Sequence, residues 1–171
     1  MKALWVLRHA KSSWDDARLD DHDRPLNRRG ERAAAGVAAW LARHPTPPSL
    51  VLCSSAKRTR QTLEPIQVAL APRLRALVER ELYLADADAL LARIARLGEN
   101  ERSVMLIGHN PGLHELAVRL AARGARDLLA RLRAKLPTAA LALLELDVAH
   151  WRDVELGCAR LAERRTPRDP D

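Results

Sequence analysis

Short runs of bulky apolar residues alternate along the chain with longer stretches whose apolar residues recur at helical spacing. Residues 2–7, 50–53 and 103–107 are compact apolar runs of the kind that form buried strands. Residues 33–41 and 86–97 instead place their apolar side chains along one face of a helix. This alternation predicts an α/β protein in three layers, a mostly parallel central sheet with helices on both faces.

Weaker patterns complete the predicted order of elements. Residues 74–79 suggest a further strand, and Asn110 and Pro111 suggest the start of a helix that runs to Gly124. Two closing strands are predicted over residues 141–146 and roughly 154–161. With 171 residues, the chain has a common length for one domain, and we expect a single domain over residues 1–171.

The charge balance suggests an acidic ligand or partner. The chain has 29 lysines and arginines against 22 acidic residues, which gives a net charge of +7. Aromatic residues make up only 3% and phenylalanine is absent, so few rings could stack on exposed bases. Because the arginines are scattered among alanines and leucines as on a solvated helix face, we do not expect nucleic-acid binding.

Several other classes of protein are disfavoured. No apolar run approaches the ~20 residues that span a bilayer, and the N-terminal segment has no small-residue cleavage site, so we expect a cytoplasmic protein that does not bind membranes. Cys53 and Cys158 are far apart and lack neighbouring ligands, which predicts two inert thiols. His109 and His114 are five residues apart and on different helix faces, so we predict no metal site.

Histidines follow two of the clearest predicted strands. Arg8 and His9 come directly after residues 2–7, and His109 follows residues 103–107. In open α/β sheets the carboxyl ends of the strands form the crevice where ligands bind. The segment after residue 53 brings Arg58 to the same edge, together with the N-terminal amides of a helix. These groups suit a phosphate, although each alone could be a hydrogen-bonded core histidine or a surface arginine.

Four segments in this order resemble the histidine phosphatase superfamily, which has a phosphoglycerate mutase-like fold and an Arg-His-Gly type motif. They are Arg8-His9-Ala10-Lys11-Ser12, Arg24-Pro25-Leu26-Asn27-Arg28-Arg29-Gly30, Cys53-Ser54-Ser55-Ala56-Lys57-Arg58-Thr59-Arg60-Gln61-Thr62 and Gly108-His109-Asn110-Pro111-Gly112. Leu136-Pro137-Thr138 and Thr166-Pro167-Arg168 extend the resemblance to the SixA-type phosphohistidine phosphatases. One departure is Ala10, where the superfamily commonly has glycine.

The resemblance implies that His9 is a nucleophile that forms a phosphohistidine intermediate, without a metal or other cofactor. It also implies that Arg8, Arg58 and His109 bind the phosphoryl oxygens. Two neighbouring guanidinium groups would keep His9 unprotonated, whereas a bound phosphate dianion would favour the cationic form of His109. Ser12 and Arg24 border the predicted pocket and are candidate substrate-binding residues, although each could be a solvated loop residue.

An ester leaving group needs a proton. The resemblance implies that a Glu after the third strand supplies it, as in superfamily members of the phosphoglycerate mutase type, and Glu81 is the nearest candidate, with Glu79 behind it. A solvated carboxylate at a strand end explains Glu81 equally well. Ser54 and Ser55 lack the flanking glycines of a nucleophile elbow, so we expect them to cap a helix.

The preferred hypothesis is a monomeric phosphatase that acts on phosphohistidine in a protein, such as a histidine phosphotransfer domain. Hydrolysis of a small phosphorylated metabolite is the alternative among enzymes. A noncatalytic phosphate-binding module is the alternative from another class, although binding alone would be served by the arginines without His9 and His109.

Overall fold

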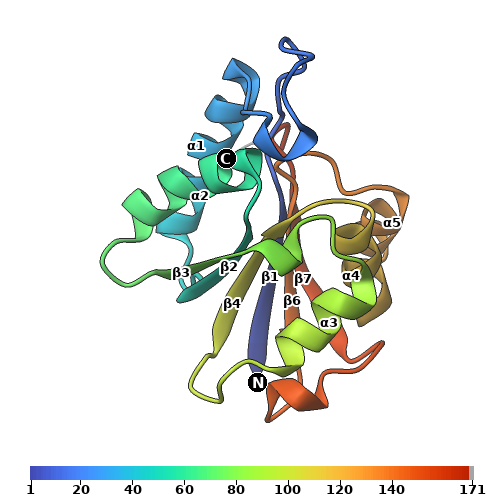
Figure 1. The fold of residues 1–171 in the computed structure, drawn as a ribbon. Helices are drawn as coiled ribbons and strands as arrows, with labels where there is room; N and C mark the ends of the chain where they lie inside the picture. The colour runs from blue at the N-terminus through green and yellow to red at the C-terminus, as the bar shows by residue number, and fades with distance from the viewer. Residues whose placement is uncertain (170–171) are drawn as a thin grey trace.

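The structure is a computed structural model that describes residues 1–169, and it contains one sheet of seven strands between two layers of helices (Figure 1). The strands lie in the order β3-β2-β4-β1-β6-β7-β5. Their bounds are β1 Lys2–Arg8, β2 Leu50–Ser54, β3 Arg75–Glu79, β4 Ser103–Gly108, β5 Ala121–Gly124, β6 Leu141–Leu146 and β7 Ala159–Arg165. The predicted α/β class with a mostly parallel sheet is confirmed, since only β6 runs antiparallel to its neighbours β1 and β7.

Five α-helices cover the two faces of this sheet (Figure 1). They are α1 Arg28–Arg43, α2 Lys57–Leu70, α3 Ala87–Ala95, α4 Gly112–Leu120 and α5 Arg126–Ala134. Three short 3-10 helices lie at η1 Asp21–Asp23, η2 Arg80–Leu82 and η3 Trp151–Asp153.

Alternation along β1 separates the core into two halves. Trp5 and Leu7 pack with the buried side chains of α1 and α2, whereas Leu4 and Val6 pack with those of α3, α4 and α5. Successive side chains of a strand point to opposite faces, so each half of the core belongs to one helical layer. Burial of all four side chains, each 0% exposed, fixes the register of β1 in the sheet.

The chain departs from the predicted order at the edge formed by β5 and β7. The helix expected to run to Gly124 ends at Leu120, because Ala121–Gly124 pair with the parallel strand β7 instead. The last strand covers residues 159–165 and not 154–161, because residues 154–158 after η3 form an irregular segment with a turn at residues 156–157. Local helical spacing was overridden here by pairing with a strand that lies far away in the sequence.

Among the helices of residues 1–169, none combines the length and the apolar character that crossing a bilayer requires. Strands β1 to β4 are mutually parallel, so their carboxyl ends meet at one edge of the sheet. Residues 9–27, between β1 and α1, form the long loop above this edge (Figure 1). The predicted phosphate-binding residues lie at this edge.

Candidate active site

His9 directly follows β1 and is held in one orientation by the backbone. Its Nδ1 lies 2.7 Å from the carbonyl oxygen of Ala10. Since a carbonyl oxygen only accepts, Nδ1 carries the proton and Nε2 carries the free lone pair. The backbone N–H of Ala10 donates to Thr62 Oγ1 at 3.0 Å, which fixes the acceptor in turn. Nε2 is therefore the nitrogen that is available to attack an electrophile.

His109 follows β4, and its ring centroid lies 5.3 Å from that of His9. Arg58 donates from Nη2 to His109 Nδ1 at 3.3 Å and from Nε to His9 Nε2 at 3.3 Å. Because a guanidinium only donates, both of these ring nitrogens are acceptors. The other nitrogen of His109, Nε2, therefore donates to Ser54 Oγ at 2.7 Å.

The two histidines are neutral in this state. Burial, followed by the charges of Arg58, Arg8 and Arg24, lowers the pKa of His9 to about 4, although its hydrogen bond to Ala10 opposes the shift. Burial and the charge of Arg58 lower the pKa of His109 to about 3. His9 is thus unprotonated at neutral pH. His109 is neutral in the free protein. We expect it to become cationic when a bound anion offsets the surrounding positive charge.

Arg8 keeps one donor free at the site. Its Nη1 donates to the carbonyl of Leu136 at 3.1 Å, but its buried Nε has no hydrogen-bond partner among residues 1–169. Burial, with a contribution from Arg58, lowers the pKa of Arg8. An unpaired buried donor beside His9 is costly in the free protein, and a phosphoryl oxygen would satisfy it.

Ser12 and Arg24, the two loop candidates, are both buried and contact each other. Arg24 Nη1 donates to Ser12 Oγ at 2.8 Å, and the guanidinium of Arg24 lies 3.5 Å from the ring centroid of Trp14. The charge of Arg24 reaches His9, because it contributes to the lowered pKa of that histidine. Neither Ser12 nor Arg24 is the solvated loop residue of the alternative interpretation.

Asp21 and Tyr83 are two residues of the site that the sequence patterns did not reveal. The Asp21 carboxylate accepts from Arg58 Nη2 at 2.9 Å, from Arg24 Nη2 at 2.8 Å and from the Tyr83 hydroxyl. Burial alone would raise the pKa of Asp21, but these hydrogen bonds and the charge of Arg58 hold it well below its usual value. The Tyr83 ring packs edge-on against His109 with centroids 5.3 Å apart.

Glu81 is directed away from the histidines. Its exposed carboxylate pairs with Arg96 at 3.0 Å and with Arg93 at 3.5 Å, both on the α3 side. Glu79 is similarly engaged, since Arg93 donates to both of its oxygens at 2.8 and 2.7 Å. The solvated ion pair therefore describes Glu81 better than a position beside His9.

The role expected for Ser54 also changes. The residue at the start of α2 is Ala56, which makes no side-chain cap, while the fully buried Ser54 holds His109. The hydroxyl of Ser55 forms a hydrogen bond of 2.8 Å with Nε2 of His22. In contrast, the predicted cap of α1 is present, because Asn27 accepts from the backbone N–H of Gly30 at 2.9 Å.

Together these groups can take part in transfer of a phosphoryl group. A nucleophilic nitrogen, a neutral imidazole and guanidinium donors converge at the carboxyl edge of the sheet. Phosphoryl transfer needs little from a protein beyond positioning and stabilisation of negative charge. Among residues 1–169 there is no cluster of three or more His, Cys, Asp or Glu side chains placed to hold a metal ion.

Comparison with known proteins supports the same chemistry. Residues 4–83 match the family model of the histidine phosphatase superfamily (branch 1). The solved structure of SixA from Agrobacterium tumefaciens is 32% identical, covers 97% of this chain and 98% of its own, and superposes with a TM-score of 0.81. The chain belongs to the histidine phosphatase superfamily.

Two further relatives match this chain over nearly its whole length. An uncharacterised protein of Mycobacterium tuberculosis is 38% identical over 164 residues, which are 95% of this chain and 100% of that protein. The protein histidine phosphatase SixA, solved in complex with tungstate, is 26% identical with a TM-score of 0.76 over 96% of this chain and 97% of its own. The similarity to SixA proteins thus covers nearly the whole length, beyond the residues matched by the family model.

Proposed function

We propose that this histidine phosphatase hydrolyses a phosphoryl group through a covalent intermediate on His9, and that its preferred substrate is phosphohistidine in another protein. The observation that carries the proposal is the fixed ring of His9, whose Nδ1 faces the Ala10 carbonyl while Nε2 faces Arg58. This arrangement presents a neutral nucleophile among cationic donors, as phosphoryl transfer to histidine requires.

The reaction proceeds in two displacements at phosphorus. His9 Nε2 attacks the phosphoryl group, the P–N bond to the substrate imidazole breaks, and the electron pair of that bond returns to the leaving nitrogen. Water then attacks the phosphorus on His9, which releases inorganic phosphate and restores the lone pair of Nε2. Arg8, Arg58 and His109 stabilise the phosphoryl oxygens in both steps.

The acid groups at the site favour phosphohistidine as the substrate. Asp21 is held ionised by its hydrogen bonds, and Glu81 is engaged in an ion pair with Arg96. Asp21 is therefore not a proton donor to a leaving group at neutral pH, and Glu81 pairs with arginines on the α3 side and not with the histidines. The labile P–N bond of phosphohistidine breaks without a strong acid, whereas an alkyl alkoxide would need one.

A trapping experiment tests the proposal. We expect the wild-type enzyme, mixed briefly with a ³²P-phosphorylated histidine phosphotransfer domain and quenched without acid, to carry label on His9. His9→Ala should lower kcat/KM by about 10⁴-fold or more, because a chemical step without its nucleophile retains only binding and electrostatic assistance. Label on another residue, or an active His9→Ala enzyme with unchanged thermal stability, would disprove the mechanism.

A second candidate substrate class is a small phosphorylated molecule. It is favoured by a strongly basic cavity lined in part by Lys11, two residues after His9, which is large enough for such a ligand. Comparison of kcat/KM for the phosphorylated domain and for a panel of phosphate esters separates the two classes.

A further inference from the structure

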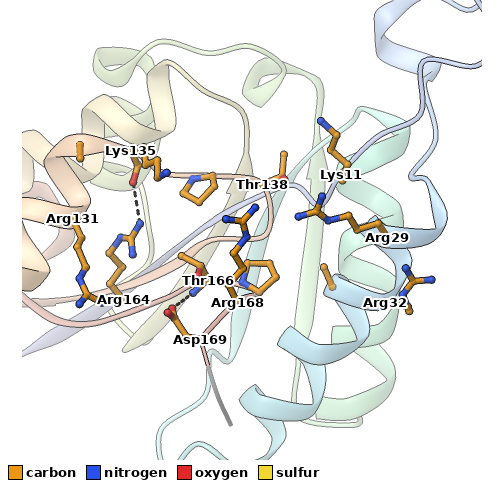
Figure 2. A pocket seen from close by; sticks show the side chains of 14 residues that line it. Lys11, Arg29, Arg32, Arg131, Lys135, Thr138, Arg164, Thr166, Arg168 and Asp169 are labelled. Carbon is orange, nitrogen blue, oxygen red and sulfur yellow. Dashed lines mark hydrogen bonds between the residues drawn. The ribbon is translucent and has the colours of Figure 1, made fainter.

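A basic pocket of about 660 Å³ lies between α1, α5 and the end of β7 (Figure 2). Its volume is in the range of pockets that hold small molecules. Seven cationic side chains line it, and they are Lys11, Arg29, Arg32, Arg131, Lys135, Arg164 and Arg168. Asp169 is the one carboxylate among the lining residues that the structure describes. These lining residues define the basic pocket.

The cations lie on two sides of the basic pocket (Figure 2). Arg29 and Arg32 come from α1, whereas Arg131 and Arg164 come from α5 and β7 on the opposite side. A ligand that contacts both sides must therefore carry more than one anionic group.

Within residues 1–169, the positive charge of the basic pocket is only partly balanced by carboxylates. Its six cations other than Arg164 are exposed, and none of them forms an ion pair with a carboxylate of residues 1–169. Arg164 is half-buried, and its buried Nε has no hydrogen-bond partner within the same residues. Burial lowers the pKa of Arg164, and the charge of Arg131 lowers it further, while Asp169 opposes the shift. A bound anion would satisfy this donor and offset the repulsion.

Two lining residues of the basic pocket lie close to the backbone that carries His9. Lys11 lines the pocket two residues after His9. Thr138, another lining residue, directly precedes Ala139, whose backbone N–H lies 3.0 and 3.1 Å from the carbonyl oxygens of Arg8 and His9. Lys11 and Thr138 therefore form the side of the basic pocket toward which a chain of phosphate groups held at His9 would extend.

The lining also limits the chemistry of the ligand. No aromatic side chain lines the described part of the basic pocket, so it offers no ring on which a nucleobase could stack. Recognition there is by charge, which suits a chain of phosphate groups.

We infer that this enzyme also hydrolyses the terminal phosphoanhydride bond of a linear polyphosphate, whose remaining phosphate groups lie in the basic pocket. The inference rests on the proposed role of His9. His9 Nε2 attacks the terminal phosphorus, the bond from phosphorus to the bridging oxygen breaks, and its electron pair stays on the departing phosphate chain. That chain leaves as an anion stabilised by the pocket cations and needs no proton from Asp21 or Glu81. Water then releases inorganic phosphate from His9.

Inorganic tripolyphosphate tests the inference, with 4-nitrophenyl phosphate as a substrate that carries a single phosphate group. We expect the wild type to release orthophosphate from tripolyphosphate in the presence of a chelator, and His9→Ala to act on neither compound. The triple variant Arg29→Gln, Arg32→Gln, Arg131→Gln should lower the ratio of kcat/KM for tripolyphosphate to that for 4-nitrophenyl phosphate by about 10-fold or more, since each exposed charge contributes a fraction of that effect. Arg152→Gln, an exposed arginine on η3 outside the basic pocket, is the matched control and should leave the ratio unchanged.

Three other outcomes would overturn the inference. If 4-nitrophenyl phosphate is hydrolysed but tripolyphosphate is not, the phosphoanhydride activity is absent while the proposed function survives. If the triple variant keeps the wild-type ratio, the basic pocket does not hold the phosphate chain. If the triple variant loses rate only on a phosphorylated protein, the pocket is a docking surface for an acidic protein. Failure of the proposed function itself is distinguished by the absence of label on His9 with every substrate.

Discussion

Arg58 links the two histidines because a guanidinium presents its donors in a rigid plane. Its Nε and Nη2 reach His9 and His109 at the same distance of 3.3 Å, and the backbone carbonyl and the carboxylate of Asp21 accept two further hydrogen bonds from Nη1 and Nη2. Lysine has a single charged nitrogen on a flexible stem and could not make this set of contacts. The geometry at Arg58 therefore orients both rings before any phosphate binds.

The buried neutral histidines make stability depend on pH. In the unfolded chain His9 titrates near its ordinary pKa of 6.5, whereas in the folded protein its pKa is about 4. Between these values the unfolded state binds more protons, so stability falls as pH is lowered from 6.5 towards 4. From pH 7 to pH 5, we expect His9 to account for a loss of about 2 kcal/mol in the free energy of unfolding.

Urea unfolding of the wild type and of His9→Asn at both pH values measures this contribution. The variant should lose about 2 kcal/mol less than the wild type between pH 7 and pH 5. Equal losses in the two proteins would mean that His9 is not held neutral by burial.

The variant Glu81→Gln tests whether Glu81 acts as a general acid. The carboxylate of Glu81 is exposed and pairs with Arg96 on the protein surface, where such pairs contribute little. We expect less than about a 2-fold change in kcat/KM on an alkyl phosphate, an aryl phosphate and phosphohistidine. A loss of about 10²-fold confined to the alkyl phosphate is the signature of a missing general acid and would contradict this expectation.

At the scale of elements, the start of α1 is packed directly against the loop after β1. A β-carbon added at Gly30 would overlap the backbone carbonyl oxygen of Lys11, two residues after His9. At Gly36, in the same helix, an added β-carbon meets nothing within 4 Å. Alanine at Gly30 therefore tests the effect of close packing, whereas alanine at Gly36 tests helix propensity alone.

We expect Gly30→Ala to lower the free energy of unfolding by about 2 kcal/mol or more, because the backbone of Lys11 must shift. Gly36→Ala should raise it by up to about 1 kcal/mol, since alanine is the better helix former and has open space. Chemical denaturation of both variants checks the pair. A destabilised Gly36→Ala protein, or a Gly30→Ala protein as stable as the wild type, would refute the packing argument.

The sequence predicted those parts of the site that strands determine. His9 and His109 follow the buried runs of β1 and β4, so their place at the carboxyl edge follows from the apolar pattern alone. Asp21 and Tyr83 lie on the loop after β1 and next to η2, and no periodic pattern fixes the direction of such side chains. Glu81 also lies in η2, and its direction depends on Arg96 of a segment that follows later in the chain. Pairing between strands that are far apart in the sequence likewise explains why the sequence pattern did not predict β5 or the bounds of β7.

At the scale of the whole molecule, the sheet gathers cations at the edge where β1, β2 and β4 end. Arg8 is the last residue of β1, Arg58 lies in the first turn of α2 after β2, and Arg24 reaches the same edge from the loop after β1. Basic residues of α1 and α5 continue this positive surface into the basic pocket. Three arginines that are far apart in the sequence thus meet at the reaction centre, which the scattered arginines of the sequence did not indicate.

This concentration of cations predicts that catalysis needs no divalent metal. In phosphoryl transfer a metal ion neutralises phosphate charge, and here Arg8 and Arg58 would do so. The carboxylate of Asp21, which could ligate a cation, already accepts from Arg58, Arg24 and Tyr83. We expect kcat/KM on 4-nitrophenyl phosphate to change less than about 2-fold after exhaustive dialysis against a chelator. Activity that is lost in the chelator and recovered with Mg²⁺ or Mn²⁺, but not with added NaCl of equal ionic strength, would show that the arginines do not supply the charge alone.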